Sequence, residues 1–272
     1  MDGTERLIRW FDSFSSCIVA FSGGVDSAVV AKAAVIALNR RATAVTGIGN
    51  AVSQYEKSVA RRMAQQIGIA HVEVATAEGE VDKYRSNDLK RCYYCKSELY
   101  SRLHAYADQI QFDVVVSGTN LDDLGEYRPG LQAASEFGIR HPLVENKLRK
   151  SDVRAIASYW GLEVALKPAS PCLASRIAYG VEVTPERLTR VEQAEDWLRA
   201  KGFSDFRVRV QQEEIARIEV SVCELSRLID VEIRNEMVAT FRRLGFARVT
   251  LDLEGLQSGS LYQIRVQKDG KS

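Results

Sequence analysis

The sequence predicts an α/β protein, with a parallel β-sheet covered by helices and a smaller α+β domain after it. Short apolar segments that are typical of buried strands alternate with helical segments in the first half of the chain. Strands joined by helices usually pair in parallel and are covered on both faces. From residue 185 onward the order changes to helix, strand, strand, helix and strand. That order is typical of a small α+β domain of the split βαβ type.

Composition and charge restrict the class of protein further. The chain has 272 residues, enough for one large domain or two modest ones. Its 37 basic and 36 acidic residues nearly cancel, so neither a nucleic-acid nor a membrane partner is expected. No apolar run approaches the ~20 residues of a membrane-spanning helix, and the N-terminus lacks the form of a signal peptide. We therefore expect a cytoplasmic protein.

The first predicted strand, residues 18–21, leads into Ser22-Gly23-Gly24-Val25-Asp26-Ser27, and a helix follows over residues 28–38. Adjacent glycines let the backbone turn sharply and approach a ligand, while the helix N-terminus favours an anion. The segment lacks the Gly-Lys-Ser/Thr ending of a Walker loop. It resembles the PP-loop of ATP pyrophosphatases, which binds the pyrophosphate of ATP. A glycine-rich turn in an ordinary strand–helix unit is the alternative, but agreement at all six positions favours the PP-loop.

Two glycines stand at the end of the second predicted strand. Gly47 and Gly49 either let the backbone lie against a ligand or mark a plain turn. Ser53 begins the next helix, and Glu56 three residues later completes a capping box. The expected elements here are a strand over 42–48, a helix over 53–66 that stops at Gly68, and a strand over 69–74.

The fourth predicted strand, residues 112–117, ends in a polar loop, Gly118-Thr119-Asn120-Leu121-Asp122-Asp123. Ligands of open α/β sheets bind beyond the carboxyl ends of the strands, so we expect this loop and the PP-loop to face one nucleotide. Thr119 and Asn120 can form hydrogen bonds with it. Asp122 and Asp123 either place a carboxylate near Mg²⁺, which prefers oxygen ligands, or are solvated turn residues.

Five cysteines in a reducing compartment argue for metal binding or catalysis rather than disulfides. Cys92 and Cys95 stand in Arg-Cys-Tyr-Tyr-Cys-Lys at the start of a predicted helix, a spacing that metal sites and redox couples use. Two buried structural thiols are the alternative. Cys172 is the expected third partner, and Cys17 and Cys223 are assigned to packing.

Arginines near the third cysteine indicate an anionic ligand. Arg176, four residues after Cys172, can bind a phosphate or carboxylate and lower the pKa of a thiol through its charge. Arg207 and Arg209 alternate along a predicted strand and therefore share one face. They bind a second anionic substrate or form a solvated strand face, and both interpretations are open.

The remaining segments complete the expected architecture. We expect a nucleotide-binding domain over 1–168, a cysteine-containing active-site segment over 169–184, and a substrate or oligomerisation domain over 185–272. The other expected helices cover 4–14, 91–108, 130–137, 151–159, 185–201, 222–230 and 232–244. The other expected strands lie near His141 and over 206–210, 215–220 and 248–251, with an irregular stretch over 78–89 and a glycine-rich loop over 252–260 before a frayed end.

Together these motifs resemble the LarE family, the sulfur transferases that build the nickel-pincer nucleotide cofactor of lactate racemase. The resemblance covers nearly the whole chain and implies a Rossmann-like fold of the adenine nucleotide alpha hydrolase, or PP-loop, type. It rests on Ser-Gly-Gly-Val-Asp-Ser (22–27), Arg-Cys-Tyr-Tyr-Cys-Lys (91–96), Gly-Thr-Asn-Leu-Asp-Asp (118–123), Arg-Pro-Gly (128–130), Pro-Cys-Leu-Ala-Ser-Arg (171–176) and Phe-Arg-Val-Arg (206–209).

The resemblance implies that ATP adenylates a carboxylate of a pyridinium dicarboxylate mononucleotide and that pyrophosphate leaves. A sulfur nucleophile then displaces AMP and gives a thiocarboxylate. In one version of the family, the cysteine matching Cys172 gives up its own sulfur in a single turnover. In the other, three cysteines hold a [4Fe-4S] cluster whose fourth iron binds sulfide. Cys92 and Cys95 beside Cys172 favour the cluster version.

The resemblance also implies a role for individual residues. The catalytic residues would be Cys172, Arg176 and Asp26, and the cluster ligands would be Cys92, Cys95 and Cys172. ATP and Mg²⁺ would be bound by Ser22, Gly23, Gly24, Asp26, Ser27, Gly118, Thr119, Asn120 and Asp123. The nucleotide substrate would be bound by Ser175, Arg176, Arg207, Arg209 and Glu219.

Other functions fit parts of the sequence. A tRNA thiolase also combines a PP-loop with three cluster cysteines, but it needs an RNA-binding surface. In an amide-forming ligase such as an NAD synthetase, the cysteines would be incidental. A nucleotide-binding regulator would keep the pocket without chemistry. For the LarE-like function, the expected partners are a small nucleotide substrate, sulfide or another sulfur donor, and further copies of the chain itself.

Overall fold

The computed structural model describes residues 3–125, 129–168 and 170–257. Arg128 of the Arg-Pro-Gly motif, residues 258–260 of the predicted glycine-rich loop and the chain end after them lie outside the described residues. No helix within the described ranges is long and apolar enough to cross a lipid bilayer.

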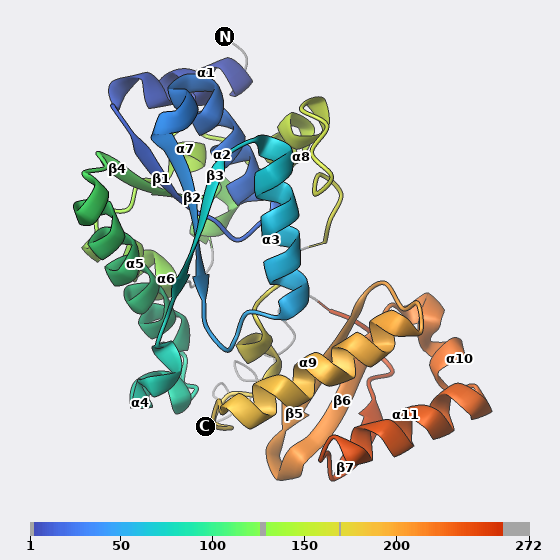
Figure 1. Cartoon of the computed structure of the whole chain (residues 1–272). Helices are drawn as coiled ribbons and strands as arrows, with labels where there is room; N and C mark the ends of the chain where they lie inside the picture. Colours follow the sequence, from blue (N-terminus) through green and yellow to red (C-terminus); the bar gives the residue numbers. More distant parts are fainter. Residues whose placement is uncertain (1–2, 126–128, 169, 258–272) are drawn as a thin grey trace. The chain divides into compact units, whose positions relative to one another are not determined.

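The chain divides into two compact units. The first comprises residues 1–84 and 90–170, and the second comprises residues 85–89 and 171–272. Figure 1 labels the helices and strands of both units.

The first unit is built on a four-stranded sheet with the order β3-β2-β1-β4. All three pairs of neighbouring strands are parallel, which confirms the predicted α/β class. Because β1 lies between β2 and β4, the loops that follow these three strands emerge at one edge of the sheet. The strands are β1 (Cys17–Ala20), β2 (Ala42–Ile48), β3 (Ala70–Ala75) and β4 (Val114–Ser117).

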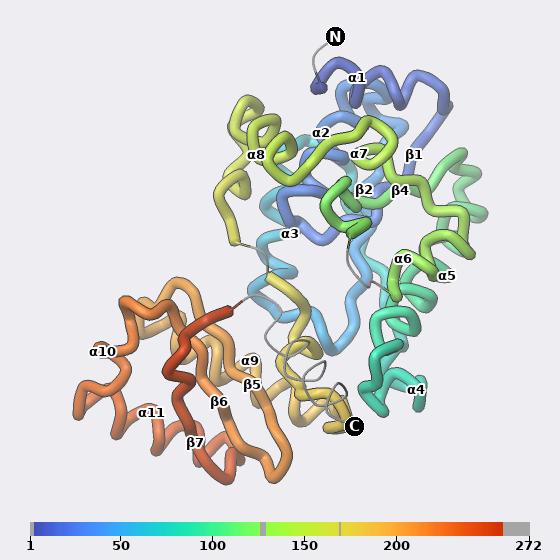
Figure 2. The backbone as a smooth tube through the Cα atoms, turned by 180° about the vertical axis from the view of Figure 1, so that it is seen from behind, coloured from blue at the N-terminus to red at the C-terminus, as the bar shows by residue number. Residues whose placement is uncertain are grey.

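Helices cover both faces of this sheet (Figures 1 and 2). One face packs Val19 and Ala44 against α1, α2, α3 and α8, and the other packs Ile18 and Val45 against α5 and α6. Helix α2 is rich in alanine and valine because most of its surface is buried. The helices of this unit are α1 (Gly3–Trp10), α2 (Val25–Leu38), α3 (Gln54–Ile67), α4 (Asp82–Arg85, whose last residue belongs to the second unit), α5 (Arg91–Ile110), α6 (Pro129–Glu136), α7 (Pro142–Glu145) and α8 (Lys150–Tyr159).

The residues at the two ends of α3 begin and end the helix as the sequence predicts. The Ser53 hydroxyl accepts a hydrogen bond from the Glu56 N–H at 3.1 Å and caps the helix. Gly68 ends it in the left-handed conformation, with φ of 78°.

Some predicted boundaries were wrong. The helix expected over 4–14 ends at Trp10, and a 3₁₀ turn (Phe11–Ser13) follows. The backbone must extend here to enter β1, and Asp113 anchors it by accepting from the N–H and hydroxyl of Ser15. The strand expected near His141 is only an isolated bridge between Val116 and Arg140.

The second unit contains a three-stranded sheet with the order β5-β6-β7. Strands β5 and β6 are antiparallel, whereas β6 and β7 are parallel. The α+β prediction is confirmed, but its split βαβ detail was wrong, because no strand separates β6 from β7. The elements are α9 (Pro185–Ala200), β5 (Phe206–Gln211), β6 (Ile215–Val220), α10 (Leu225–Leu228), α11 (Val231–Arg243) and β7 (Arg248–Leu251).

Asn87 attaches residues 85–89 to the second unit. Its side chain is fully buried, and Nδ2 donates to the backbone oxygens of Ile177, Ala178 and Val181 at 3.3, 2.9 and 2.8 Å. One buried side-chain amide therefore bonds three backbone oxygens of the segment that follows Arg176.

Candidate functional site

The PP-loop joins β1 to α2 and needs its glycines. Gly23 has φ of 72°, and a Cβ there would lie 2.6 Å from the Cα of Ala60 in α3. Ser27 Oγ donates to the Gly24 oxygen at 3.1 Å, and Ser22 Oγ accepts from the Gly24 N–H at 3.3 Å. The two serines thus fix the loop from within. The first N–H groups of a helix have no intrahelical partner, so the start of α2 suits an anion.

The loop after β4 lies beside the PP-loop. Asn120 is 2% exposed, and its Nδ2 donates to Asp26 Oδ1 at 3.2 Å. Its own N–H donates to Asp123 Oδ2 at 3.0 Å. Gly118 approaches α2 so closely that a Cβ would lie 2.7 Å from the Ser27 nitrogen. The structure therefore brings the two predicted nucleotide-binding loops together.

Thr119 belongs to a short chain of hydrogen bonds. Its hydroxyl lies 3.0 Å from Ser117 Oγ, which lies 2.8 Å from Nδ1 of His141. Burial lowers the pKa of His141, which favours the neutral imidazole. Thr119 is thus held in place beside the PP-loop.

Asp122 has a structural role at the start of α8. Its Oδ1 accepts from Arg149 Nη1 and its Oδ2 accepts from the Lys150 N–H, both at 2.9 Å. Asp122 is exposed, as expected of a solvated turn residue, and both of its oxygens also hold the N-terminus of a helix.

Lys150 is a residue at this edge that sequence reasoning missed. Its Nζ lies 2.5 Å from Asp26 Oδ2, and Asn120 occupies the other Asp26 oxygen. A cation in the first turn of a helix is disfavoured by the helix dipole. A lysine there indicates an anionic partner, and this signal was readable in the sequence.

We expect Lys150→Met to lower the kcat/KM for ATP by about 10²-fold, because Asp26 would lose its counter-charge beside the expected phosphates. The ammonium itself is lost as a phosphate ligand as well. ATP-dependent pyrophosphate release measures the effect. Lys147→Met, an exposed lysine in the same connection, is the matched control. Equal kinetics for the two variants would contradict a role for Lys150 in ATP binding.

Gly47 and Gly49 stand at the end of β2. A Cβ at Gly49 would lie 2.0 Å from Oε1 of Glu78, and one at Gly47 would lie 2.6 Å from Leu99 Cδ1. Both glycines therefore make room for the protein's own side chains, which supports the plain-turn interpretation.

Cys92 and Cys95 lie in the first two turns of α5. Three residues apart, they share one side of the helix; Cys92 is exposed and Cys95 is half-buried. A Cβ at Gly130 of α6 would lie 3.0 Å from Lys96 Cγ and 3.7 Å from the Cys92 oxygen. Gly130 therefore allows α6 to approach the part of α5 that carries the two thiols.

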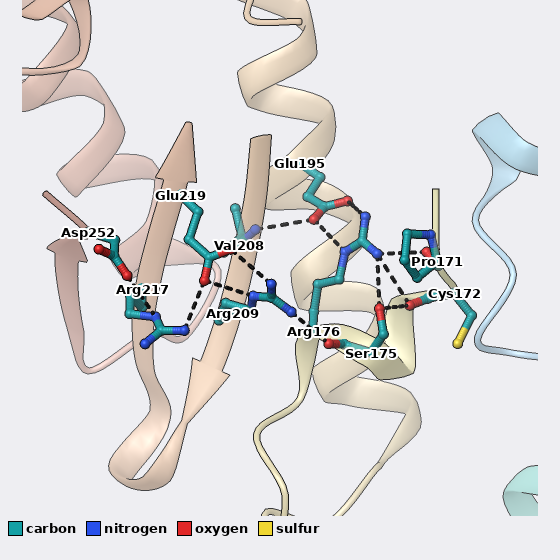
Figure 3. Close-up of polar contacts among 10 residues, drawn as sticks. All are labelled: Pro171, Cys172, Ser175, Arg176, Glu195, Val208, Arg209, Arg217, Glu219 and Asp252. Atoms are coloured by element: carbon teal, nitrogen blue, oxygen red, sulfur yellow. Dashed lines mark hydrogen bonds and ion pairs between the residues drawn. The ribbon is translucent and has the colours of Figure 1, made fainter. Parts of the chain in front are cut away.

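Cys172 belongs to the second unit and begins a tight turn over residues 171–176, here called the Cys172 turn. Its thiol is exposed, and Figure 3 shows its sulfur directed away from the neighbouring guanidinium groups. The Ser175 N–H and hydroxyl both bond the Cys172 oxygen, at 2.9 and 2.7 Å. No group of three or more His, Cys, Asp or Glu side chains suited to a metal ion occurs among the described residues.

Arg176 lies inside the second unit, 5% exposed, and pairs with the equally buried Glu195 of α9. Its Nε donates to Glu195 Oε1 at 2.9 Å. Its Nη1 donates to the Pro171 oxygen at 2.6 Å and to Ser175 Oγ at 3.0 Å (Figure 3). Glu195 was not among the predicted residues, and its place inside a helix gave no signal.

Arg209 forms a second buried pair with Glu219, across the antiparallel strands β5 and β6. Nε and Nη2 bond the two Glu219 oxygens at 3.0 and 2.9 Å, and Nη1 donates to the Ser175 oxygen at 3.0 Å. Glu219 also accepts from Arg217 Nη2 at 2.8 Å, and Arg217 lies 3.6 Å from Asp252. The interpretation of the β5 arginines as a solvated face was wrong for Arg209, which is 4% exposed.

Arg207 differs from these two arginines. It is half-buried and stands opposite Glu219 in the strand register. Its side chain makes no hydrogen bond or ion pair with the described residues. Burial, followed by the charges of Arg176 and Arg209, lowers the pKa of the Arg207 guanidinium. A half-buried cation beside two further cations has the chemistry to accept an anion.

The other two cysteines behave differently from each other. Cys17 is buried in β1, and burial raises the pKa of its thiol, which agrees with packing. Cys223 is exposed in a short 3₁₀ helix (Val222–Glu224), where its sulfur lies 3.2 Å from Ser221 Oγ. The packing assignment of Cys223 was therefore wrong.

Comparison with known proteins now adds to this geometry. A model of the NAD synthase family matches residues 10–120, which include the PP-loop and the start of the loop after β4. The pyridinium-3,5-bisthiocarboxylic acid mononucleotide synthase of Lactiplantibacillus plantarum is 38% identical over 258 residues, 94% of this chain and 92% of that protein. The chain belongs to the LarE family. LarE proteins are ATP-dependent sulfurtransferases, and so is this chain.

Two uncharacterized proteins extend the comparison. One from Synechocystis sp. is 44% identical over 260 residues, 96% of this chain and 97% of that protein. One from Methanocaldococcus jannaschii is 35% identical over 175 residues, 64% of this chain and 67% of that protein. In this LarE-family chain, the predicted residues fall into two groups. The ATP-binding set, with Cys92 and Cys95, belongs to the first unit, whereas Cys172, Ser175 and the arginines belong to the second.

Proposed function

We propose that this LarE-family protein adenylates a carboxylate of pyridinium-3,5-dicarboxylate mononucleotide with ATP and converts it into a thiocarboxylate. A carboxylate oxygen attacks the α-phosphorus of ATP, and the bond to pyrophosphate breaks. A sulfide sulfur then attacks the acyl carbon, and AMP leaves with the electron pair of the broken C–O bond. The observation that carries this proposal is similarity over nearly the full length to a synthase named for the bisthiocarboxylic acid product.

In the first step, the PP-loop supplies the site for the leaving pyrophosphate. The N–H groups at the start of α2 point at the position of the anion and need no reorganisation during the reaction. Lys150 adds a positive charge to the same edge through its contact with Asp26. Mg²⁺, held with ATP by Asp26 or Asp123, would offset further phosphate charge.

The nucleotide substrate carries a phosphate and two carboxylates, and Arg207 is the proposed receptor for one of these anions. Arginine binds phosphate and carboxylate through two parallel hydrogen bonds. The pairing of Arg176 and Arg209 with Glu195 and Glu219 leaves Arg207 as the cation with capacity for a new anion in this cluster.

Cys92, Cys95 and Cys172 are the proposed ligands of a [4Fe-4S] cluster. The donor chemistry fits, because thiolates are the usual ligands of such clusters and the Cys92 and Cys172 thiols are exposed. The N-terminal part of α5 supplies two of the thiols, three residues apart in the helix. When bound, the cluster would supply an iron without a protein ligand, at which sulfide can be held.

Anaerobic iron and sulfide analysis tests the sulfur source. We expect about four irons per chain and an absorbance band near ~400 nm, both lost in Cys92→Ala. With substrate, ATP, Mg²⁺ and sulfide, AMP and thiocarboxylate should form in equal amounts over many turnovers. An iron-free protein that loses about 34 Da, one H₂S, in a single turnover would instead identify Cys172 as the sulfur donor. Thiolation only of added tRNA would overturn the proposed substrate.

A further inference from the structure

The Cys172 turn is held by two arginines that reach it from different parts of the second unit. Arg176 belongs to the turn itself and is fixed by Glu195 of α9, while Arg209 of β5 is fixed by Glu219 of β6. These four residues, here called the arginine brace, are all 5% exposed or less. Figure 3 shows both guanidinium groups directed at the turn.

The two arginines of the brace donate to backbone oxygens of the turn, to the Ser175 hydroxyl and to their partner carboxylates. Arg176 donates to the oxygen of Pro171 at 2.6 Å, and Arg209 donates to the oxygen of Ser175 at 3.0 Å. The two oxygens stand on either side of Cys172 in the sequence. Charge-assisted hydrogen bonds of this kind are about twice as strong as neutral ones, so together they restrain the turn at both ends.

The buried carboxylates orient the guanidinium groups. Glu195 Oε1 also accepts from the Val208 N–H at 3.1 Å, which ties α9 to β5. Glu219, fully buried, also accepts from Arg217. A buried ion pair contributes little net stability because desolvation offsets the attraction. Two such pairs converging on one short turn therefore indicate a need for fixed geometry rather than for stability.

We propose that Arg176 and Arg209 are positioning residues that hold the Cys172 turn, with Glu195 and Glu219 orienting them, and that Arg207 alone binds the substrate anion in this cluster. The inference rests on the proposed function, since the value of the positioning lies in the use of the Cys172 thiol. A reacting group displaced by about 1 Å can lose about 10²-fold in rate. The arginine brace would keep the Cys172 sulfur away from the guanidinium groups and in one fixed position relative to the turn.

Arg209→Met tests this in the full-length protein without leaving a buried charge alone, because Glu219 keeps Arg217. Arg190→Met is a matched control. Arg190 shares Glu214 with Arg187, just as Arg209 shares Glu219 with Arg217, and its partners lie outside the Cys172 turn. We expect amide hydrogen exchange in residues 172–177 to become about tenfold faster in Arg209→Met, because a charged hydrogen bond is lost. Exchange there should be unchanged in Arg190→Met.

Kinetics separate positioning from substrate binding. Arg209→Met should lower kcat for thiocarboxylate formation by about 10²-fold with the KM for the nucleotide substrate little changed. Arg207→Gln should raise that KM and leave exchange in the turn unchanged. The double variant Arg176→Met with Glu195→Gln, which keeps an acceptor for the Val208 N–H, should repeat the Arg209→Met pattern.

The outcomes discriminate between the two proposals. Unchanged exchange in both brace variants would overturn the positioning role, and a raised KM with unchanged exchange would place Arg209 on the substrate. Failure of the wild-type protein to form thiocarboxylate would overturn the proposed function. The exchange measurement needs no substrate and would still decide whether the brace holds the turn.

Discussion

Replacing Cys172 by alanine is expected to reduce thiocarboxylate formation by at least about 10³-fold while adenylation of the substrate continues. The thiol is exposed and directed away from the arginine brace, so its loss removes no packing. The turn itself is held by backbone oxygens, which alanine retains. Either proposed source of sulfur, a cluster ligand or a sacrificial thiol, requires this sulfur atom.

The two half-reactions are measured separately. Substrate-dependent exchange of labelled pyrophosphate into ATP reports adenylation and should stay within a few-fold of wild type, as general positioning of ATP by the first unit is unaffected. Thiocarboxylate is followed by mass spectrometry. Cys223→Ala, an exposed cysteine in the same unit, is the matched control and should behave as wild type. Repeated turnovers in Cys172→Ala would show that Cys172 takes no part in the reaction.

Local signals explain why most of the fold could be predicted from the sequence. Strands β2, β6 and β7 have the predicted bounds because apolar runs or alternation end at clear turn residues. Ser53 and Gly68 mark the ends of α3 through contacts within a few residues. The pairing of β6 with β7 has no such signal. It depends on how α11 packs, so the split arrangement could not be excluded from the sequence.

The residues of the candidate site also differ in whether they could be predicted from the sequence. The PP-loop and the Cys-x-x-Cys turn are contiguous motifs and were readable directly. Glu195 and Arg217 act through partners that the fold brings together, such as Arg176, which is 19 residues away from Glu195 in the chain. Arg207 and Arg209 share one strand face and look alike in sequence. Deeper burial of Arg209, its pairing with Glu219 and its reach to the Ser175 oxygen distinguish them in the structure.

The close approach of the loop after β4 to α2 makes Gly118 a sensitive position for ATP binding. A methyl group there would lie 2.7 Å from the nitrogen and 3.0 Å from the Cα of Ser27, and 2.9 Å from the carbonyl carbon of Asp26. All three are backbone atoms of the first turn of α2, which cannot move aside as a flexible side chain does. To relieve these contacts, α2 and the loop after β4 would have to move apart.

We therefore expect Gly118→Ala to weaken ATP binding by at least about 10²-fold, because the phosphate-binding N–H groups and Asp26 would be displaced from Asn120. Overpacking should also cost about 1–3 kcal/mol of stability. Calorimetric titration with ATP and thermal unfolding measure the two effects. Gly79→Ala is the matched control, since a Cβ at Gly79 meets no atom within 4 Å. Wild-type ATP affinity in Gly118→Ala would show that the nucleotide does not depend on the contact between these two loops, and the assignment of Asn120 and Asp123 to ATP would then fail.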